Sequence, residues 1–198
     1  MAPEVRKATK ADVSEMSAML SRAFHDDPVK IDLLPDEAKR VSRGPALFAT
    51  FASFHLPNNE VYVTPGLEAA ALWEPPGHWK VPAARIVTNL PRTFKIFGLR
   101  LFRNLGVLTD IEKAHPREPH YYLAVLGTDP AHQNKGFGTA LMEPVLAQCD
   151  REGVGAYLES SKESNIAFYS RFGFQVTGEY VFRGGGAKVW FMWRDPRG

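Results

Sequence analysis

Apolar residues recur at helical spacing near the start of the chain. Met16 and Leu20 lie on one face of an expected helix, and Thr9 with Asp12 in front of it is typical of a capping box. Proline is favoured in a first helical turn, so Gly44-Pro45 is expected to start a second helix. This part of the chain is therefore predicted to form a short strand at 3–8, a helix that ends at 25–28, and a helix from 44 onward.

Strand-like and helix-like patterns alternate along the rest of the chain. Residues 60–64 and 69–74 predict a hairpin, because Pro65-Gly66 between them is typical of a turn. Residues 81–118 have a helical period, which Pro91, Gly98 and Gly106 divide into shorter pieces. The second half is predicted to contain strands at 120–128, 156–159, 175–182 and 188–193, and helices at 136–151 and 165–171.

Several predicted strands follow one another without a helix between them. Such an order favours one mixed sheet over a doubly wound parallel sheet. No linker, repeat or low-complexity tract interrupts the sequence. We therefore expect a single domain over residues 1–198 of the mixed α/β (α+β) class, with a helical insertion at about 81–118.

Composition narrows the function classes. Hydrophobic residues make up 44% and the formal net charge is only +2, so nothing in the sequence demands nucleic acid or a membrane surface as a partner. The single cysteine, Cys149, excludes an internal disulfide and is expected in the core rather than as a reactive thiol. The six histidines lack the spacing of a metal site. With no basic-then-apolar leader pattern at Met1, a cytoplasmic protein is expected.

The segment from Leu126 to Leu141 carries the most specific chemical signal. A strand ends near Thr128, and a helix begins at Gly136 and Gly138, so unpaired backbone amides there can receive a phosphate. A Walker loop is excluded, since no glycine lies four residues before a Gly-Lys-Ser/Thr. A dinucleotide fingerprint requires a glycine or alanine where Leu141 stands. Glu159 does lie near the distance of that fingerprint's ribose-binding acid, so this alternative stays open. The other two interpretations are a Gln-x-x-Gly-x-Gly loop that opens a helix and a glycine-rich helix start without a ligand.

This loop resembles the coenzyme A loop of the GNAT acetyltransferase superfamily. The downstream block Asn165 to Phe174 is similar to that superfamily's Asn-x-x-Ala-x-x-x-Tyr-x-x-x-Gly-Phe segment, slightly shortened. The likeness is greatest to puromycin N-acetyltransferase-like members, which share Glu118-Pro119 and the Asp-Pro-x-His-Gln-x-Lys-Gly run from Asp129. The resemblance is strong over 118–178 and absent from 81–117. It implies a mainly antiparallel central sheet flanked by helices, with the cofactor where two central strands splay apart.

The resemblance also implies which residues hold acetyl-coenzyme A. Backbone groups of the strand end would hold the acetyl-pantetheine arm, and an amide near Leu126 would polarise the thioester carbonyl. The loop and the first helical turn would wrap the pyrophosphate, and Asn165 and Tyr169 would complete the site. The expected cofactor-binding set is Leu126, Gly127, Thr128, Gln133, Asn134, Lys135, Gly136, Phe137, Gly138, Thr139, Asn165 and Tyr169.

Two residues are candidates for catalysis. Tyr169 matches the family's general acid, which protonates the departing thiolate; the alternative is a core aromatic residue. Glu159 matches a glutamate in the corresponding strand of the puromycin enzymes and is the candidate base. The alternative for Glu159 is an ordinary strand-end carboxylate or ion pair.

Residues of the acceptor site are less defined. Asp26 and Asp27 follow the first helix, where the family places acceptor contacts, although helix-end solvation also explains them. Trp73 and Glu74 on the hairpin are candidates to line the same cleft, with core packing as the alternative for Trp73. We expect direct acetyl transfer to a primary amine of a small molecule, by a monomer or homodimer. The alternatives are a protein or peptide N-acetyltransferase and a non-catalytic acyl-coenzyme A-binding regulatory module.

Overall fold

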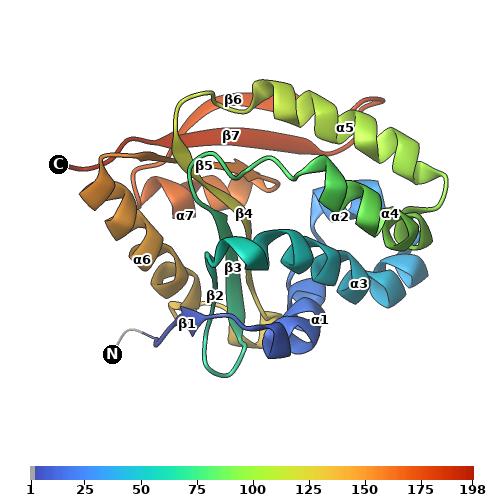
Figure 1. Cartoon of the computed structure of the whole chain (residues 1–198), viewed down its shortest axis with the longest axis horizontal. Coiled ribbons are helices and arrows are strands. Elements are labelled where there is room, and N and C mark those ends of the chain that lie inside the picture. The colour runs from blue at the N-terminus through green and yellow to red at the C-terminus, as the bar shows by residue number, and fades with distance from the viewer. Residues whose placement is uncertain (1–2) are drawn as a thin grey trace.

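The computed structural model describes residues 3–198 and contains one central sheet of seven strands. The strand order is β1-β2-β3-β4-β5-β7-β6, and every neighbouring pair is antiparallel except β4 and β5. Figure 1 shows the sheet passing through the middle of the molecule. The expected mixed, mainly antiparallel sheet is confirmed. The strands are β1 (Arg6–Lys7), β2 (Val61–Val63), β3 (Ala69–Glu74), β4 (His120–Thr128), β5 (Gly155–Ser160), β6 (Gln175–Val181) and β7 (Lys188–Arg194).

Helices cover both faces of this sheet, with α6 on one side of Figure 1 and α1 and α3 on the other. Side chains of α6 and α7 pack with alternate residues of β3, β4 and β5 into one core cluster. On the other face, α1 and α3 pack against β2 and β3, and α5 packs against β5 and β7. The helices are α1 (Val13–Ala23), α2 (Pro28–Leu33), α3 (Glu37–His55), α4 (Ala83–Phe97), α5 (Arg100–Ala114), α6 (Phe137–Glu152) and α7 (Ile166–Ser170).

The helices before the hairpin differ from the expectation. Helix α3 begins at Glu37 rather than at Gly44, because the Asp36 side chain caps it by accepting a hydrogen bond from the Lys39 amide. Gly44 serves helix packing instead: a Cβ there would lie 2.1 Å from Oγ of Ser21 in α1. The short helix α2 was not expected. Its cap is Asp27, at the position where the sequence indicated only a helix end.

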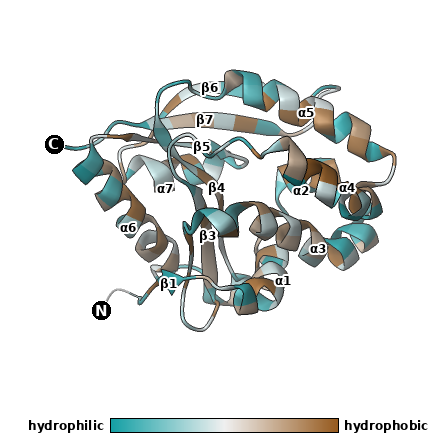
Figure 2. Ribbon diagram, viewed as in Figure 1, coloured by the Kyte–Doolittle hydropathy of each residue, from teal (hydrophilic) through white to brown (hydrophobic). Residues whose placement is uncertain are grey.

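The insertion at 81–118 forms two helices, and the break between them falls at Gly98, as expected. Pro91 and Gly106 lie inside helices and do not end them; Pro91 is exposed, so water can satisfy the carbonyl it leaves unpaired. Ion pairs from Arg103 to Asp32 and from Asp110 to Arg183 tie α5 to its neighbours. Figure 2 shows apolar segments along both helices, and the exposed apolar residues include Val87, Leu99 and Phe102.

Two further expectations can be compared with the described residues. Cys149 is fully buried, and burial raises the pKa of its thiol to about 12, so it remains a protonated core residue. Within residues 3–198, no helix combines the length and the apolar character needed to cross a bilayer.

Candidate active site

The two parallel strands at the centre of the sheet separate part of the way along their length. Pairing between β4 and β5 ends at Leu123 and Leu158. Beyond that point β4 continues along β3 as far as Thr128, while β5 continues along β7 as far as Ser160. A narrow cavity of about 50 Å³ lies in the resulting opening. Its walls are Phe24, Leu123, Ala124, Val125, Leu126, Leu158, Glu159, Ser160, Ser161, Asn165 and Tyr169.

A β-bulge in β4 lies at the mouth of this opening. Leu72 pairs with Val125 and Trp73 pairs with Leu123, so Ala124 is an extra residue without a partner in β3. A bulge leaves backbone groups outside the regular ladder and changes which side chains share a face. Ala124 and Val125 accordingly both pack with the α1–α3 side of the core. This arrangement directs the backbone of the strand end into the cavity.

The strand end itself lies under α1. A Cβ on Gly127 would come 2.7 Å from Leu20 and 2.9 Å from Phe24, so only glycine allows the helix to pack this closely. Arg22, near the end of α1, forms a 2.5 Å ion pair with Asp129, and Asp129 also accepts a hydrogen bond from the Ala131 amide. The first helix therefore holds both the end of β4 and the start of the following loop.

Backbone geometry at the next turn exposes the N-terminus of α6. Asn134 and Gly136 adopt left-handed φ angles of 61° and 83°, which favour glycine and are tolerated by asparagine. Gly136 is the N-cap residue, and it supplies no side-chain hydrogen bond to the first-turn amides. These amides and the dipole of a 16-residue helix form an anion-binding end. The geometry fits the pyrophosphate of a coenzyme A derivative.

The remaining residues predicted for this region surround the same helix end. Residues 133–136 are exposed and 137–139 are half-buried. Lys135 adds an exposed positive charge. A Cβ on Gly138 would be 3.3 Å from the ring of Phe168 in α7, so this glycine brings α6 and α7 together. Of the predicted cofactor-binding residues, Leu126, Asn165 and Tyr169 line the cavity, whereas residues 127–139 are outside its lining.

Tyr169 and Asn165 come to the cavity from the α7 side. Tyr169 is 8% exposed and packs in the core cluster that contains Leu158. Burial and the nearby negative charge of Asp27 raise the pKa of its hydroxyl well above the ordinary value. The phenol is therefore protonated at neutral pH. Asn165 precedes α7 and lines the cavity beside it.

Glu159 reaches the cavity from the opposite face of the sheet. Along β5, its side chain alternates with those of Leu158 and Ser160 and lies on the same face as Tyr157, which packs against α5. Its side chain is 10% exposed, and its Oε1 atom is buried without a hydrogen-bond partner among the described residues. Nδ1 of His115 lies 3.6 Å from this Oε1 atom. A buried carboxylate oxygen without a donor can accept a proton.

The two aspartates predicted for acceptor binding have different environments. Asp26 is exposed and forms a 2.8 Å ion pair with Lys162, just beyond β5. Asp27 is buried: one oxygen accepts from the Lys30 amide and the other from the hydroxyl of Ser161, which lines the cavity. Asp27 therefore holds α2 against the cavity wall, while Asp26 meets solvent.

Trp73 and Glu74 lie outside the cavity lining. Trp73 is fully buried among α6-side residues, on the face opposite to Glu159. Glu74 is 2% exposed, pairs with His55 at 2.5 Å and accepts a hydrogen bond from Asn58. Both of its oxygens are occupied.

Some residues of the opening were not found from the sequence. Phe24 and Ser161 line the cavity, and Ala124 forms the bulge. His115 and His120 lie Nε2 to Nε2 at 2.9 Å, with His115 beside Glu159. The sequence showed only that both histidines lie near the start of the strand at 120–128. Their neighbour Glu159 is far away in the sequence, so no local pattern indicated the contact.

Comparisons with known proteins agree with this geometry. The model of the acetyltransferase (GNAT) family matches residues 94–174. An uncharacterized N-acetyltransferase of Schizosaccharomyces pombe is 28% identical over 180 residues, which cover 85% of this chain and 73% of the relative.

Solved structures share the whole fold. One from Corynebacterium glutamicum, described as histone acetyltransferase HPA2 and related acetyltransferase, has 26% identity and a TM-score of 0.75, covering 100% of this chain and 98% of that one. The polyamine N-acetyltransferase of Drosophila melanogaster, which forms N-acetylagmatine, has 17% identity and a TM-score of 0.68, with 97% and 99% coverage. The chain is thus similar to the acetyltransferase (GNAT) family over residues 94–174, to an N-acetyltransferase relative over most of its length, and to solved acetyltransferases in its whole fold.

Proposed function

We propose that this protein transfers an acetyl group from acetyl-coenzyme A directly to a primary amine of a small molecule. The observation that carries the proposal is the opening between β4 and β5. Tyr169 and Glu159 line it from opposite faces of the sheet. The uncapped start of α6 packs through Gly138 against Phe168, the neighbour of Tyr169 in α7, so an anion site lies on the same side of the sheet as the proton donor.

The proposed cofactor site consists of backbone more than of side chains. First-turn amides of α6, with Asn134 and Gly136 shaping the turn, would hold the pyrophosphate, and Lys135 would add charge. Backbone groups of residues 126–128 would hold the pantetheine arm. Acetyl-coenzyme A would supply an activated acetyl thioester at this place.

Two side chains would manage protons. Glu159 accepts a proton from the acceptor ammonium, which must be neutral to attack, because its Oε1 has no hydrogen-bond partner within residues 3–198. Tyr169 holds a proton on its hydroxyl at neutral pH and donates it to the departing sulfur. An amide of the β4 end would stabilise the negative charge that develops on the carbonyl oxygen. No covalent enzyme intermediate is needed, which agrees with the buried position of Cys149.

The elements around the Glu159 side of the opening favour a small amine over an extended peptide as the acceptor. Helix α5 packs over β5 and β7 there, and Trp79 in the segment before α4 stacks on His115. These elements leave little room for an extended peptide. Among structural neighbours, the Drosophila enzyme acts on a polyamine-type acceptor. Asp26 is the predicted acceptor residue with an exposed carboxylate, and it suits a cationic amine. The likeness to puromycin-type enzymes stays a prediction.

Two measurements test the proposal. Acetyl-coenzyme A at about 1 mM should raise the melting temperature, because a ligand that binds only the native state stabilises it. No shift would contradict the cofactor assignment. Thiol release should then be followed with a panel of small amines beside a panel of peptides. Turnover on small amines supports the acceptor class, whereas turnover on peptides alone would establish the protein-acetylating alternative, and binding without turnover would establish the regulatory module.

A further inference from the structure

Helix α4 turns its apolar stripe toward solvent. Ile86, Leu90 and Phe94 recur every four residues and therefore share one face of the helix, with Val87 beside them. All four side chains are exposed. An amphipathic helix on the surface of a globular domain normally packs such a stripe against the core. In α4, which lies wholly within the described part of the chain, Ile96 alone is buried.

Polar contacts hold the opposite face of α4 against the rest of the molecule. The Arg85 guanidinium donates a hydrogen bond of 2.8 Å to the backbone carbonyl of Phe54 in α3. Arg43 of α3 donates a second bond of 2.8 Å to the backbone carbonyl of Ile96. These bonds determine which side of α4 faces inward, so its apolar stripe is a fixed outer surface of the fold.

The exposed apolar residues continue onto α5. Leu99 lies in the two-residue link between the helices, and α5 places further apolar side chains outward at intervals of three residues. Leu99 is 80% exposed and Phe102 is 70% exposed, the largest values among the exposed large hydrophobic residues. Apolar segments are visible along both helices in Figure 2. We name this set the α4–α5 apolar surface: Ile86, Val87, Leu90, Phe94, Leu99, Phe102, Leu105 and Leu108.

The charges around this surface have one sign. Residues 75–109 include six of the 24 basic residues and none of the 22 acidic residues, so this segment carries +6 and the rest of the chain −4. The small net charge of the whole chain conceals this local excess. Arg92, Lys95 and Arg100 are exposed, and none of them forms an ion pair within residues 3–198. Apolar side chains flanked by lysine and arginine are typical of helices that lie in the interface of an anionic membrane.

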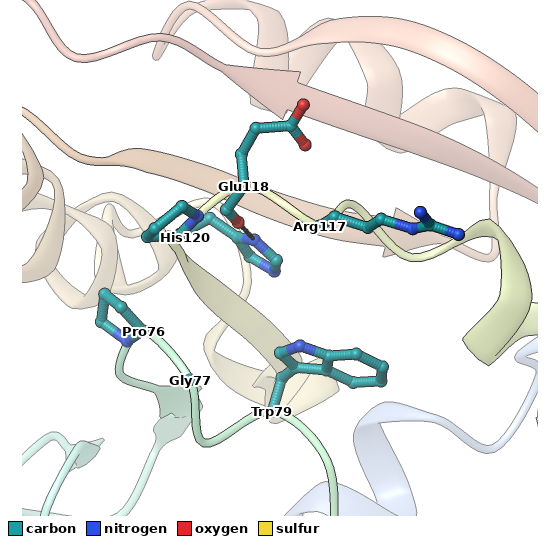
Figure 3. A pocket seen from close by; sticks show the side chains of 7 residues that line it. Pro76, Gly77, Trp79, Arg117, Glu118 and His120 are labelled. Carbon is teal, nitrogen blue, oxygen red and sulfur yellow. Dashed lines mark hydrogen bonds between the residues drawn. The ribbon is translucent and has the colours of Figure 1, made fainter.

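The two principal cavities of the molecule lie elsewhere. One is the opening between β4 and β5. The other, of about 310 Å³, lies between segments 76–79 and 117–120, where Figure 3 shows Trp79 across from His120. Neither cavity is lined by a residue of α4 or α5. The α4–α5 apolar surface thus offers protruding side chains and no hollow for an anchor side chain of a protein partner, and a fluid bilayer needs no such hollow.

The same charges disfavour a second copy of this chain as the partner. In a twofold interface the same patch meets itself. Arg92, Lys95 and Arg100 would then approach cations of the other copy, and residues 75–109 contain no acid to pair with them. A bilayer with anionic headgroups supplies the opposite charge that this segment lacks.

We propose that the α4–α5 apolar surface docks on a membrane that contains anionic phospholipids. Leu99 and Phe102 enter the boundary between headgroups and acyl chains, and the three exposed cations lie beside the lipid phosphates. Each lysine or arginine close to such a surface strengthens binding by about fivefold, and salt screens this attraction. Docking uses no residue of the opening between β4 and β5, so it stands or falls independently of the proposed function.

Sedimentation with lipid vesicles tests the proposal on the full chain. The protein should sediment with vesicles of phosphatidylcholine and phosphatidylserine in equimolar mixture, and hardly at all with vesicles of phosphatidylcholine alone. Raising the salt from about 0.05 to about 0.5 M should weaken the binding, because exposed charges are then screened. Equal binding to both compositions, or binding to neither, would overturn the proposal.

Two double variants separate the contribution of charge from that of apolar side chains. Arg92→Gln with Lys95→Gln should lower the partition coefficient on mixed vesicles by about 25-fold. Leu99→Ser with Phe102→Ser should lower it by about tenfold or more. All four side chains are exposed, so both variants should fold, and circular dichroism checks this.

Matched controls carry the same substitutions on other helices. Arg151→Gln removes an exposed cation of α6 that has no ion pair among the described residues, and Val41→Ser removes an exposed apolar side chain of α3. Both should bind mixed vesicles as wild type does. Controls that lose as much binding as the double variants would show non-specific adsorption and contradict the proposal.

A fluorescent label reports insertion directly. The only native thiol, Cys149, is fully buried, so an environment-sensitive dye can be attached selectively to Leu99→Cys. Its emission should shift to the blue with mixed vesicles, whereas a dye on Val41→Cys should not respond. Light scattering examines the competing partner: a dimer that the Leu99→Ser and Phe102→Ser changes dissociate, without vesicle binding, would mean that a second copy covers this surface and that the proposal is wrong.

Discussion

The ends of strands β3 and β5 each carry a glutamate, buried in Glu74 and half-buried in Glu159, and the two have different surroundings. Glu74 at the end of β3 pairs with His55 and accepts a hydrogen bond from Asn58. Glu159 near the end of β5 has a buried oxygen without a partner and faces His115 at a distance too long for a hydrogen bond. Both residues lie on the face of the sheet that is opposite to α6.

This difference distinguishes a carboxylate that stabilises the fold from one that is free to react. A carboxylate with all its partners in place stabilises the arrangement around it and has no capacity left for a substrate. A buried carboxylate with a free oxygen costs stability, and such a cost is typical of functional sites. Under the proposed function, the β3 end therefore serves the fold, and the β5 end serves the reaction. Each of the following substitutions tests one side of this contrast.

Replacement of the free carboxylate should have the largest effect. Glu159→Gln preserves size and removes the proton acceptor, so kcat for amine acetylation should fall by about 10²–10⁴-fold. Stabilisation by acetyl-coenzyme A should persist, because Glu159 is on the acceptor side of the opening. Steady-state thiol release, with thermal shift on the same sample, measures both quantities. A variant with wild-type kcat would place Glu159 with Glu74 as a structural residue.

Removal of the proton donor should have the next largest effect. Tyr169→Phe keeps the ring packed against Phe168 and Phe174 and deletes only the hydroxyl. We expect kcat to fall by about 10²-fold with the KM for acetyl-coenzyme A within about twofold. Because the folded protein raises the pKa of Tyr169, the donor stays protonated up to alkaline pH, and an alkaline decline of kcat below pH ~10 belongs to another group. Equal kcat in both proteins would show that Tyr169 only packs.

How well the sequence anticipated these regions depended on whether a feature is local. The helix start at Gly136 and the strand at 120–128 are encoded in neighbouring residues, and each was predicted. The contrast between Glu74 and Glu159 was not, because their partners His55 and His115 are distant in sequence. Contacts between residues so distant in sequence depend on how the strands are paired in the sheet.

The same limit explains the errors in helix boundaries. Gly44-Pro45 has the local pattern of a helix start, yet α3 begins seven residues earlier, at Glu37. Gly44 is needed because α3 approaches Ser21 of α1 closely. This is a contact between two helices, and no local sequence pattern encodes it. Tertiary packing overrode the local preference there.

Replacement of the satisfied carboxylate should alter stability more than activity. Glu74→Gln leaves His55 without its charged partner in a buried place, and the free energy of unfolding should fall by about 2–4 kcal/mol. Turnover of the folded variant should remain within about threefold of wild type. Urea denaturation and thiol release below the melting temperature measure the two effects. A large rise in the acceptor KM with unchanged stability would instead return Glu74 to the acceptor site, where the sequence placed it.

The smallest expected effect concerns a third buried charge, whose side-chain amine bonds neutral groups. Lys30 is 3% exposed and donates to the carbonyl and the hydroxyl of Ser21. Burial, with the nearby charge of Arg40, lowers the pKa of its amine from 10.5 to about 8, against the opposing effect of Asp27. The unfolded chain therefore binds more protons than the folded protein between these two values. Stability attributable to this group should rise as the pH increases from about 8 to 10.5.

The contribution of Lys30 can be isolated by comparison with Lys30→Met, which cannot titrate. The difference in unfolding free energy between wild type and variant should change by an amount on the order of 3 kcal/mol across that window, in favour of wild type at the alkaline end. Below pH 7 the difference should be constant, because the amine is charged in both states. Denaturation at several pH values measures it. A difference that is flat across the window would mean that the two hydrogen bonds from Lys30 to Ser21 compensate the buried charge, so that Lys30 resembles Glu74 rather than Glu159.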